Sequence, residues 1–599
     1  MKDFFKMLGA STLGVLIGGA ILFFISIILM MGIAASFTSK PAFRLEDKTV
    51  LALTLDKPVN DRIGNSPFDY LMMGSTKSYS LNSILSAIKK AKENDKIKGI
   101  YIKTGAGQIG YASIEPIRAA LEDFKSSGKF VITYGDNIAQ NLYYVASASD
   151  KIYLNPQGML DFRGLSWNTQ FNRDVFKKWG VDIQVFKVGT YKSAVEPMID
   201  TKMSDANREQ VTSYLTDIWG HMLDGISSNR NISIEDLNKY ADEYLAFTDP
   251  QKVLEYGLVD GLKYESEVEE HIKGLMDLNK EQKIKFASVD NINSIPDKSA
   301  MKQKDRIAIL YAEGSIESAG DGPSLGGIRI TDKEYVKELR RLKDDDNVKA
   351  VVFRVNSGGG SAYASEQIWH AVKELKAVKP IVVSMGDYAA SGGYYISCCA
   401  TKIVAEHNTL TGSIGIFGLY PSAEQLAQKM GAHYDGVATN QNSGLGNEVL
   451  SIPFIGLGLL PARPLNNAEM NMLQAYVERG YDLFISRCAE GRGMTKDQID
   501  AIGQGRVWTG SQALGIGLVD ELGSMSRAIE IAANEAGIDN YSMEYYPKEK
   551  DFFAQLMEDS SEGIATRFTK AIMGNEAYEQ KMMINAWQNF DYRQAIMIE

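Results

Sequence analysis

The sequence predicts an α/β protein with two tandem copies of one domain, each built from parallel strands and helical crossovers, after one N-terminal transmembrane helix. Three observations support this prediction. Residues 45–295 and 296–545 present the same motifs in the same order. In each copy, short β-branched runs alternate with helix-like stretches, a pattern typical of parallel sheets. Finally, Leu13–Ala35 is apolar over 23 residues, which is long enough to span a bilayer.

The two copies align with a constant offset in their central part. Asp136 of the first copy matches Asp387 of the second, which lies 251 residues later. The order strand, helix, strand, helix is therefore predicted twice: at residues 96–103, 114–126, 130–134 and 140–148, and again at 348–354, 365–377, 381–385 and 392–400. Two copies of about 250 residues fall within the usual size range of domains.

The ends of the chain are predicted to serve different purposes. Residues 1–44 are interpreted as a short cytoplasmic tail and an uncleaved anchor, because the apolar stretch is too long for a typical signal-peptide core. Cleavage at Ala34–Ser36 is the alternative. In the simplest topology everything after Lys40 is exported. Residues 546–599 are rich in methionine and aromatic residues and are predicted to form a helical tail.

Composition excludes several classes of function. The net charge of −11 and the pI of about 5.3 argue against a nucleic-acid partner. The sparse cysteines form neither a disulfide framework nor a zinc motif: Cys398, Cys399 and Cys488. None of the histidines lies in a metal-binding motif: His221, His271, His370, His407 and His433. We therefore expect no metal and no cofactor.

Each copy retains only one member of a candidate catalytic pair. At the common offset Ser391 falls on Gln140, and Lys192 falls on Ser443. The first copy thus lacks the serine and the second lacks the lysine. A single Ser/Lys site formed across the two copies would account for both losses.

Ser391 lies at a predicted turn between a strand and a helix. A serine there is often a helix N-cap, which is the simpler interpretation. Gly392 and Gly393 favour a functional role, because paired glycines let the backbone approach a bound group and are poor helix formers. The Gly-rich loop Asn356–Ser361 is either a flexible connection or a source of backbone amides for an oxyanion.

Lys192 lies between small and apolar residues. Most lysines are solvated surface residues. A lysine base must be neutral, so its pKa would have to fall from about 10.4 to about 7–8 through burial. The hydroxyl of Ser413, within Thr411–Gly415, is a candidate for holding the amine in place.

Four motifs together resemble the signal peptide peptidase A (protease IV) family, in its long, duplicated, membrane-anchored form. They are Tyr191-Lys-Ser-Ala-Val-Glu-Pro197, Arg354-Val-Asn-Ser-Gly-Gly-Gly-Ser361, Ala389-Ala-Ser-Gly-Gly-Tyr394 and Leu410-Thr-Gly-Ser-Ile-Gly-Ile-Phe-Gly418. The resemblance covers about residues 45–545 and includes the order of the motifs.

This resemblance implies a serine endopeptidase with a Clp-protease/crotonase-like fold that degrades cleaved signal peptides and other hydrophobic peptides at the membrane. It implies that Ser391 is the nucleophile, Lys192 the general base and Ser413 the residue that orients the lysine. It assigns the oxyanion hole to Gly359 and Gly392. It also implies a homotetramer on the bacterial inner membrane, single-pass, with its catalytic region in the periplasm.

One residue departs from the family pattern, and two other functions stay open. Gly358 stands where the family usually has proline, so the turn is less restricted in φ. The alternatives are a catalytically inactive membrane scaffold and an acyl-CoA enzyme of the crotonase type. The loss of one residue from each copy and the membrane anchor argue against the second.

Overall fold

The computed structural model describes residues 43–62, 78–105, 107–296, 303–318, 329–446, 448–450, 460–548 and 597–598, together with residues 14, 17–19, 21 and 25. Most of the predicted membrane span Leu13–Ala35 and most of the predicted helical tail 546–599 lie outside these residues. None of the helices within the described ranges has the length and hydrophobicity needed to cross a membrane.

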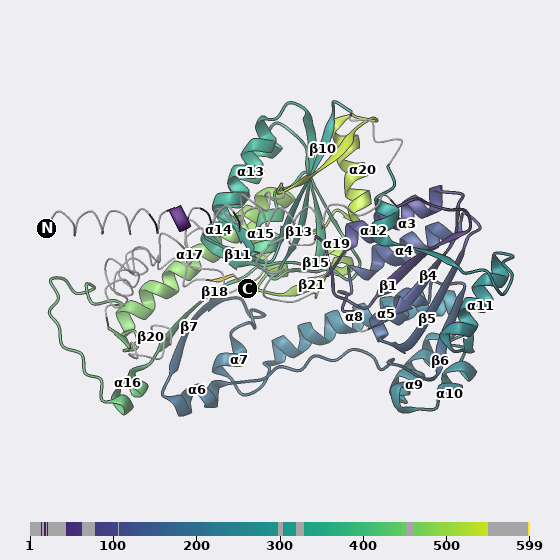
Figure 1. Ribbon diagram of the computed structural model, residues 1–599. Coiled ribbons are helices and arrows are strands. Elements are labelled where there is room, and N and C mark those ends of the chain that lie inside the picture. Colours follow the sequence, from purple (N-terminus) through teal and green to yellow (C-terminus); the bar gives the residue numbers. More distant parts are fainter. Residues whose placement is uncertain are drawn as a thin grey trace.

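The first copy is built around a six-stranded parallel sheet (Figure 1). Its strand order is β8-β6-β5-β4-β1-β9, and every neighbouring pair is parallel. The strands are β1 (Thr49–Leu55), β4 (Ile97–Thr104), β5 (Phe130–Ile138), β6 (Lys151–Leu160), β8 (Gly261–Leu262) and β9 (Lys285–Ser288). The prediction of parallel strands with helical crossovers is confirmed here.

The second copy repeats this sheet and extends it by an antiparallel edge strand. Its main order is β21-β17-β15-β13-β10-β23, with β16 paired to β15 and β22. The strands are β10 (Arg306–Glu313), β13 (Val348–Ser357), β15 (Ile381–Ala390), β16 (Lys402–Ala405), β17 (Leu410–Gly412), β21 (Val507–Thr509), β22 (Glu521–Leu522) and β23 (Ser542–Tyr546). Only β17 and β21 pair antiparallel in this sheet.

The offset of 251 residues is also structural. β4, β5 and β6 begin at Ile97, Phe130 and Lys151, and their counterparts β13, β15 and β16 begin at Val348, Ile381 and Lys402. The helix α5 (Gln140–Ala146) likewise corresponds to α15 (Gly392–Ser397). The prediction of a tandem duplication is therefore confirmed.

Helices cover both faces of each sheet. In the first copy, one face packs against α3 (Leu81–Glu93), α4 (Ile114–Lys125), α5 and α8 (Asp205–Arg230), and the other against α11 (Glu265–Leu275). In the second copy, one face packs against α13 (Asp332–Asp344), α14 (Ala362–Lys376), α15 and α17 (Asn467–Arg492), and the other against α20 (Met525–Ala536). Each copy thus has two apolar cores, one on each side of its sheet.

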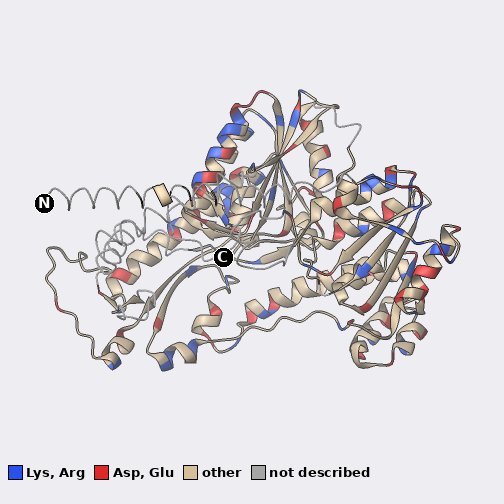
Figure 2. Ribbon diagram, in the orientation of Figure 1, with Lys and Arg blue, Asp and Glu red and all other residues tan. Residues whose placement is uncertain are grey.

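A two-stranded antiparallel ribbon joins the two copies. β7 (Asp182–Val188) from the first copy pairs with β18 (Ile416–Ser422) from the second. The ribbon extends away from both sheets toward α6 (Arg173–Trp179) and α16 (Glu424–Met430) (Figure 1). β18 carries no charged residue, and the ribbon is drawn mostly in tan in Figure 2. The copies are therefore intertwined, and Lys192 follows directly from this shared ribbon.

Short strands form a small second sheet beside the main sheet of the second copy. Its order is β12-β11-β14-β24, with β11 (Ser315–Glu317), β12 (Arg329–Thr331), β14 (Gly360–Ser361) and β24 (Met597–Ile598). The backbone of β24 pairs antiparallel with β14. β14 belongs to the Gly-rich loop that follows β13. The remaining short elements are β2 (Val59–Asn60), β3 (Tyr79–Ser80), α7 (Glu196–Ile199), α9 (Ile234–Asp242), η1 (Leu245–Phe247), α10 (Pro250–Glu255), α12 (Val289–Asn293), β19 (Val449–Leu450), β20 (Leu460–Pro461), α18 (Lys496–Ile502) and α19 (Gly510–Gly515).

Candidate active site

Ser391 lies at the sharp turn between β15 and α15, in a backbone conformation that is unusual for a serine. Its φ is 54° and its ψ is −114°. Its amide donates to the carbonyl of Gly412 at 2.8 Å, and its own carbonyl accepts the amide of Tyr395 at 2.8 Å. Within the described part of the chain its hydroxyl caps no helix amide. Ser391 therefore occupies the N-cap position of α15 without capping the helix through its side chain. Its positive φ marks a strained position of the kind that clusters at functional sites.

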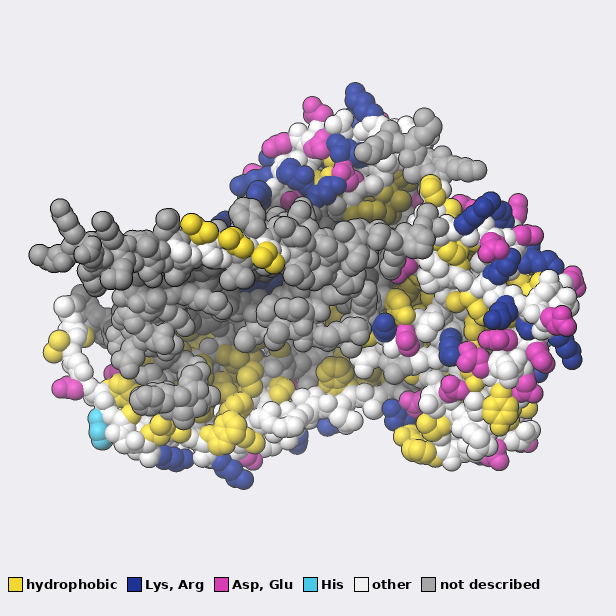
Figure 3. Space-filling model, viewed as in Figure 1, with side chains coloured by type: hydrophobic (Ala, Val, Ile, Leu, Met, Phe, Trp, Pro, Cys, Tyr) yellow, Lys and Arg dark blue, Asp and Glu magenta, His cyan; other side chains and the backbone are white. Residues whose placement is uncertain are grey.

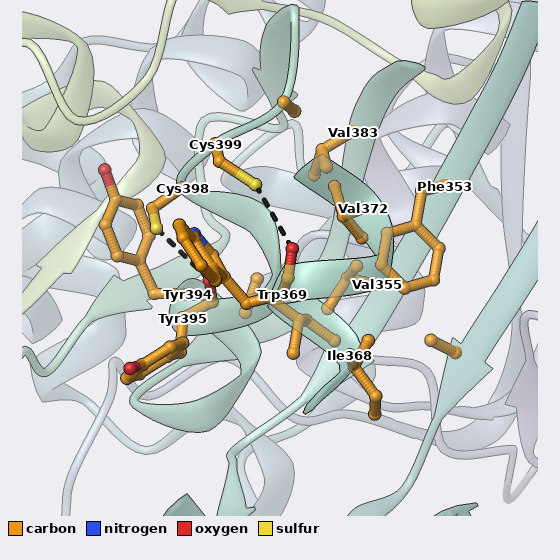
Figure 4. Close-up of a cluster of buried hydrophobic side chains, with 14 of the residues drawn as sticks. Phe353, Val355, Ile368, Trp369, Val372, Val383, Tyr394, Tyr395, Cys398 and Cys399 are labelled. Atoms are coloured by element: carbon orange, nitrogen blue, oxygen red, sulfur yellow. Dashed lines mark hydrogen bonds between the residues drawn. The ribbon is translucent and has the colours of Figure 1, made fainter. Parts of the chain in front are cut away.

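The residues that follow this turn belong to a packed apolar core (Figure 4). Tyr394 and Tyr395, which follow the two glycines, are buried beside Trp369 of α14. Their hydroxyls donate to the carbonyl of Leu518 at 2.9 Å and to the carboxylate of Glu366 at 2.6 Å. Cys398 and Cys399, which follow, are free and buried. This packing fixes the start of α15, and with it Ser391.

Lys192 reaches Ser391 from the first copy. Lys192 follows β7, is 1% exposed, and places its Nζ 2.9 Å from the Oγ of Ser391 and 3.1 Å from the Oγ of Ser413. Ser391 and Ser413 are buried as well. Lys192 thus contacts both of the serines that the sequence selected, although the serines and the lysine belong to different copies. A buried amine is driven toward its neutral form, because desolvation penalises the charged one.

Gly505 was not predicted, yet it shapes the lysine position. It has a φ of 78°, and a Cβ placed on it would lie 2.7 Å from the backbone N, Cα and Cβ of Lys192. Its carbonyl accepts the hydroxyl of Ser413 at 3.3 Å, and its amide donates to the carbonyl of Ile414 at 2.7 Å. Gly505 therefore lets the lysine segment approach while it orients Ser413. The only signal in the sequence was a Gly-Gln-Gly run.

The Gly-rich loop comes close to the start of α15. A Cβ on Gly392 would lie 3.1 Å from the Cα of Gly359, so the two predicted oxyanion donors are neighbours. Gly359 has a φ of 114°, and its amide donates to the Oγ of Ser357 at 3.1 Å. The amide of Gly392 is the first of α15 and has no partner within the helix. A Cβ on Gly358 would meet no atom within 4 Å, so this position has room for the Cβ of a larger residue.

Buried ionisable groups lie between the two copies near this site. Asp61, after β2, accepts hydrogen bonds from the guanidinium of Arg354 at 2.9–3.1 Å, and both side chains are 3% exposed. Asp387 accepts hydrogen bonds from the amide of Ser113 at 3.0 Å and from its hydroxyl at 2.5 Å. Arg354 lies on β13, which leads to the Gly-rich loop, and Asp387 lies on β15, which leads to Ser391. These contacts therefore tie the first copy to the catalytic edge of the second.

Two carboxyl groups in this region are expected to make stability depend on pH. Burial raises the pKa of Glu406 to about 8, against the opposing charge of Arg354. Burial and the charge of Asp61 raise the pKa of Glu313 to about 7. Both pKa values lie above the value of about 4.3 in the unfolded chain. The folded protein therefore holds these protons more tightly, and the contribution of the two groups to the free energy of unfolding is fully present below about pH 4.3 and is lost as the pH rises through the folded pKa values.

We therefore expect the free energy of unfolding to fall between about pH 5 and pH 8. Urea unfolding at several pH values measures this change. Glu406→Gln should make the profile flatter over this window, because the amide cannot ionise. An unchanged profile in that variant would contradict the assignment to Glu406.

Comparisons with known proteins agree with this picture of two related copies. A family model described as "Peptidase family S49" matches residues 123–279 and 373–539. "Protease 4" of Haemophilus influenzae is 34% identical over 512 residues, which is 82% of this chain and 80% of that protein. "Protease 4" of Salmonella typhi is 35% identical over 554 residues, covering 89% of this chain and 85% of the relative. "Serine protease SPPA, chloroplastic" of Arabidopsis thaliana is 30% identical over 500 residues, covering 83% and 71%.

Proposed function

The chain belongs to peptidase family S49 and is a protease, and we propose that it is a serine endopeptidase with a Ser/Lys dyad. Each half of the chain carries one copy of the family domain. The observation that carries the proposal is the distance of 2.9 Å between the Nζ of Lys192 and the Oγ of Ser391, in a buried site shared by both copies. Ser413 orients the amine from its other side.

The proposed reaction is acyl transfer to Ser391 followed by hydrolysis. Neutral Lys192 accepts the proton of the Ser391 hydroxyl as Oγ bonds to the carbonyl carbon of the peptide. The resulting ammonium gives that proton to the leaving amine when the C–N bond breaks. Water then attacks the acyl-enzyme, again with Lys192 as base, and releases the acid and the free serine.

The developing oxyanion is stabilised by the amides of Gly359 and Gly392. The Gly359 amide must leave the hydroxyl of Ser357 to do this. Ser357 is itself held, because its hydroxyl donates to the carbonyl of Gly314 at 2.6 Å. We propose that the carbonyl oxygen of a bound substrate replaces the hydroxyl of Ser357 as acceptor of the Gly359 amide. The oxyanion hole then has both of its donors only when the peptide is bound.

The substrates that we propose are extended hydrophobic peptides, including cleaved signal peptides. The edge of β14 supports this, because its backbone pairs antiparallel with β24 directly after Gly359. An extended substrate that takes the place of β24 can pair with the same edge, as in other cases of β-augmentation. In this proposal the chain is a tetramer anchored in the bacterial inner membrane through Leu13–Ala35, with its catalytic region in the periplasm.

A fluorophosphonate probe tests the function directly. We expect it to label Ser391 covalently, and we expect the protein to hydrolyse a short apolar peptide. An acyl-CoA enzyme of the crotonase type needs no serine nucleophile, and an inactive scaffold would hydrolyse nothing. Labelling at another serine, or hydrolysis that persists after complete labelling of Ser391, would refute the assignment. Ser149→Ala, at a buried serine of the first copy that bonds to Thr133, is the matched control for labelling.

A further inference from the structure

The first copy keeps a cavity at the place where the second copy has its nucleophile. The cavity measures about 540 Å³ and opens at the ends of β4 and β5. It is lined by Thr104, Gly105, Asp136, Asn137, Ile138, Ala139, Met159, Asp161, Arg163, Tyr244, Ala246 and Phe247. With the offset of 251 residues, Asp136 and Ala139 correspond to Asp387 and Ala390, the residues that lead to Ser391.

The first copy has no serine at the position that corresponds to Ser391. Gln140 replaces the nucleophile, and its Oε1 accepts the amides of Arg163 and Gly164 at 2.9 Å each. Its Nε2 donates to the carbonyl of Gly164 at 3.1 Å. The side chain thus fixes the neighbouring turn. The cavity is present at this sheet edge, but the side chain at the position of the nucleophile only holds the neighbouring turn.

The mouth of the cavity is apolar and exposed. Phe247 is 79% exposed, Met159 42% and Tyr244 41%, and the rings of Tyr244 and Phe247 lie 5.0 Å apart. Hydrophobic side chains reach the surface in this lobe near α9 and α10, which flank η1 (Figure 3). Tyr244 has a φ of 53°, which is strained for an aromatic residue. Three large apolar side chains held in solvent around one cavity are typical of a binding site.

Polar groups complement this mouth. The guanidinium of Arg163 lies beside it, 3.1 Å from both the carboxylate of Asp161 and the hydroxyl of Tyr244. Asp136 accepts hydrogen bonds from Tyr134 at 2.6 Å and from Asn155 at 2.9 Å. A peptide could bind all of these groups. Its backbone carbonyls can accept hydrogen bonds from a guanidinium, its amides can donate to a carboxylate, and its apolar side chains can pack on the aromatic rings.

The cavity is also connected to the catalytic edge. The loop that leaves β4 at Gly105 leads to Ala112 and Ser113, whose amides donate to Asp387 at 2.9 and 3.0 Å. Asp387 lies four residues before Ser391. A long peptide held in the first copy is therefore close to a loop that touches the edge where cleavage is proposed.

We propose that this cavity is a second, non-catalytic peptide site that holds an apolar segment of a long substrate while another segment reaches Ser391. The proposal rests on the proposed peptidase function for its substrate class. The occupant is an unfolded apolar peptide, with aliphatic or aromatic side chains against Met159, Tyr244 and Phe247. The site contributes affinity for long peptides and takes no part in bond breaking.

Binding to the Ser391→Ala protein tests this without turnover. The probe is a labelled peptide of about 20 apolar residues, the length of a membrane-spanning segment. Adding Phe247→Ala is expected to raise its Kd about tenfold, since burial of a Phe side chain accounts for an effect of at least this size. Leu275→Ala on α11, also exposed but on the opposite face of the sheet, is the matched control and should leave the Kd unchanged.

The same substitution in the active protein separates this proposal from the proposed function. Phe247→Ala should raise KM for the long peptide and leave kcat/KM for a short soluble peptide unchanged. A protein that hydrolyses both peptides but binds the long one equally well with Phe247→Ala would overturn the second site alone. A protein that binds the long peptide through Phe247 but hydrolyses neither would overturn only the peptidase. A change in oligomer mass with Phe247→Ala, measured by sedimentation, would show a subunit contact instead and would also overturn the proposal.

Discussion

Ser391→Ala and Lys192→Ala are each expected to abolish hydrolysis of a short apolar peptide. For Lys192 the loss in kcat should be about 10²–10⁴-fold, the range for removal of a general base. For Ser391 it should be at least as large, because no covalent intermediate can form. Both residues are buried in one cluster, and the Nζ of Lys192 lies 2.9 Å from the Oγ of Ser391. Single-turnover and steady-state assays measure both effects.

The double variant distinguishes a catalytic unit from two independent contributions. When residues act together, removing the second costs little once the first has gone. We expect Ser391→Ala with Lys192→Ala to be no slower than either single variant. Lys192→Met keeps the volume of the buried chain and should be as inactive as Lys192→Ala, but more stable. If Lys192→Met kept more than about a tenth of the activity, far above the range for loss of a base, another residue would be the base.

The identity of the base also determines the pH profile of the wild-type protein. The proposed base works only without its proton, so kcat/KM should rise with pH as Lys192 is deprotonated. Charging the buried amine at lower pH removes activity. The histidine chosen for comparison is His407, whose ring stacks on that of His221 at 3.8 Å between centroids. His407→Gln should leave the rising limb in place; loss of the limb would favour a histidine.

The sequence could predict the repeated strands and the reactive residues, for identifiable reasons. β4 and β13 are β-branched runs bounded by turn residues, and this local pattern survives in the fold. The selection of Ser391 and Lys192 depended on comparing the copies, which needs only one chain. The strands proved longer than predicted, because β13 and β15 continue through polar residues to Ser357 and Ala390. Hydrogen bonding to neighbouring strands, which hydropathy does not report, extends them.

Long-range contacts could not be predicted in this way. Nothing local to Gly505 indicates that it would lie against Lys192, more than 300 residues earlier. Asp61 and Arg354, which form an ion pair, are also far apart in the sequence. An aspartate after a short strand is expected at the surface, because aspartates are rarely buried. Such contacts depend on how the two copies dock, and docking is determined by the summed shape and charge of both surfaces. Those same contacts therefore give the sharpest test of how the copies are held together.

Asp61→Ala is expected to destabilise the protein more than any single change at an exposed ion pair. The guanidinium of Arg354 donates hydrogen bonds to both carboxylate oxygens of Asp61, to the hydroxyl of Ser384 at 3.0 Å and to the carbonyl of Met385 at 2.6 Å. Removing Asp61 leaves a buried cation without its closest anion, which typically costs about 3–5 kcal/mol in the free energy of unfolding. Asp123→Ala is the matched control. It breaks the exposed pair with Lys92, where the aspartate is 67% exposed, and should cost less than about 1 kcal/mol.

The loss caused by Asp61→Ala should itself depend on pH, because Glu406 also acts on the charge of Arg354. With its pKa raised to about 8 by burial, Glu406 is neutral at pH 5 and cannot replace the missing carboxylate. Near pH 8 it ionises and compensates part of the buried charge. Urea unfolding should therefore show a larger loss at pH 5 than at pH 8. The double variant Asp61→Leu with Arg354→Met should recover much of the stability at both pH values, because it removes both buried charges together. An equal loss at the two pH values, with no recovery in the double variant, would mean that Asp61 holds the copies together by packing and not by its charge.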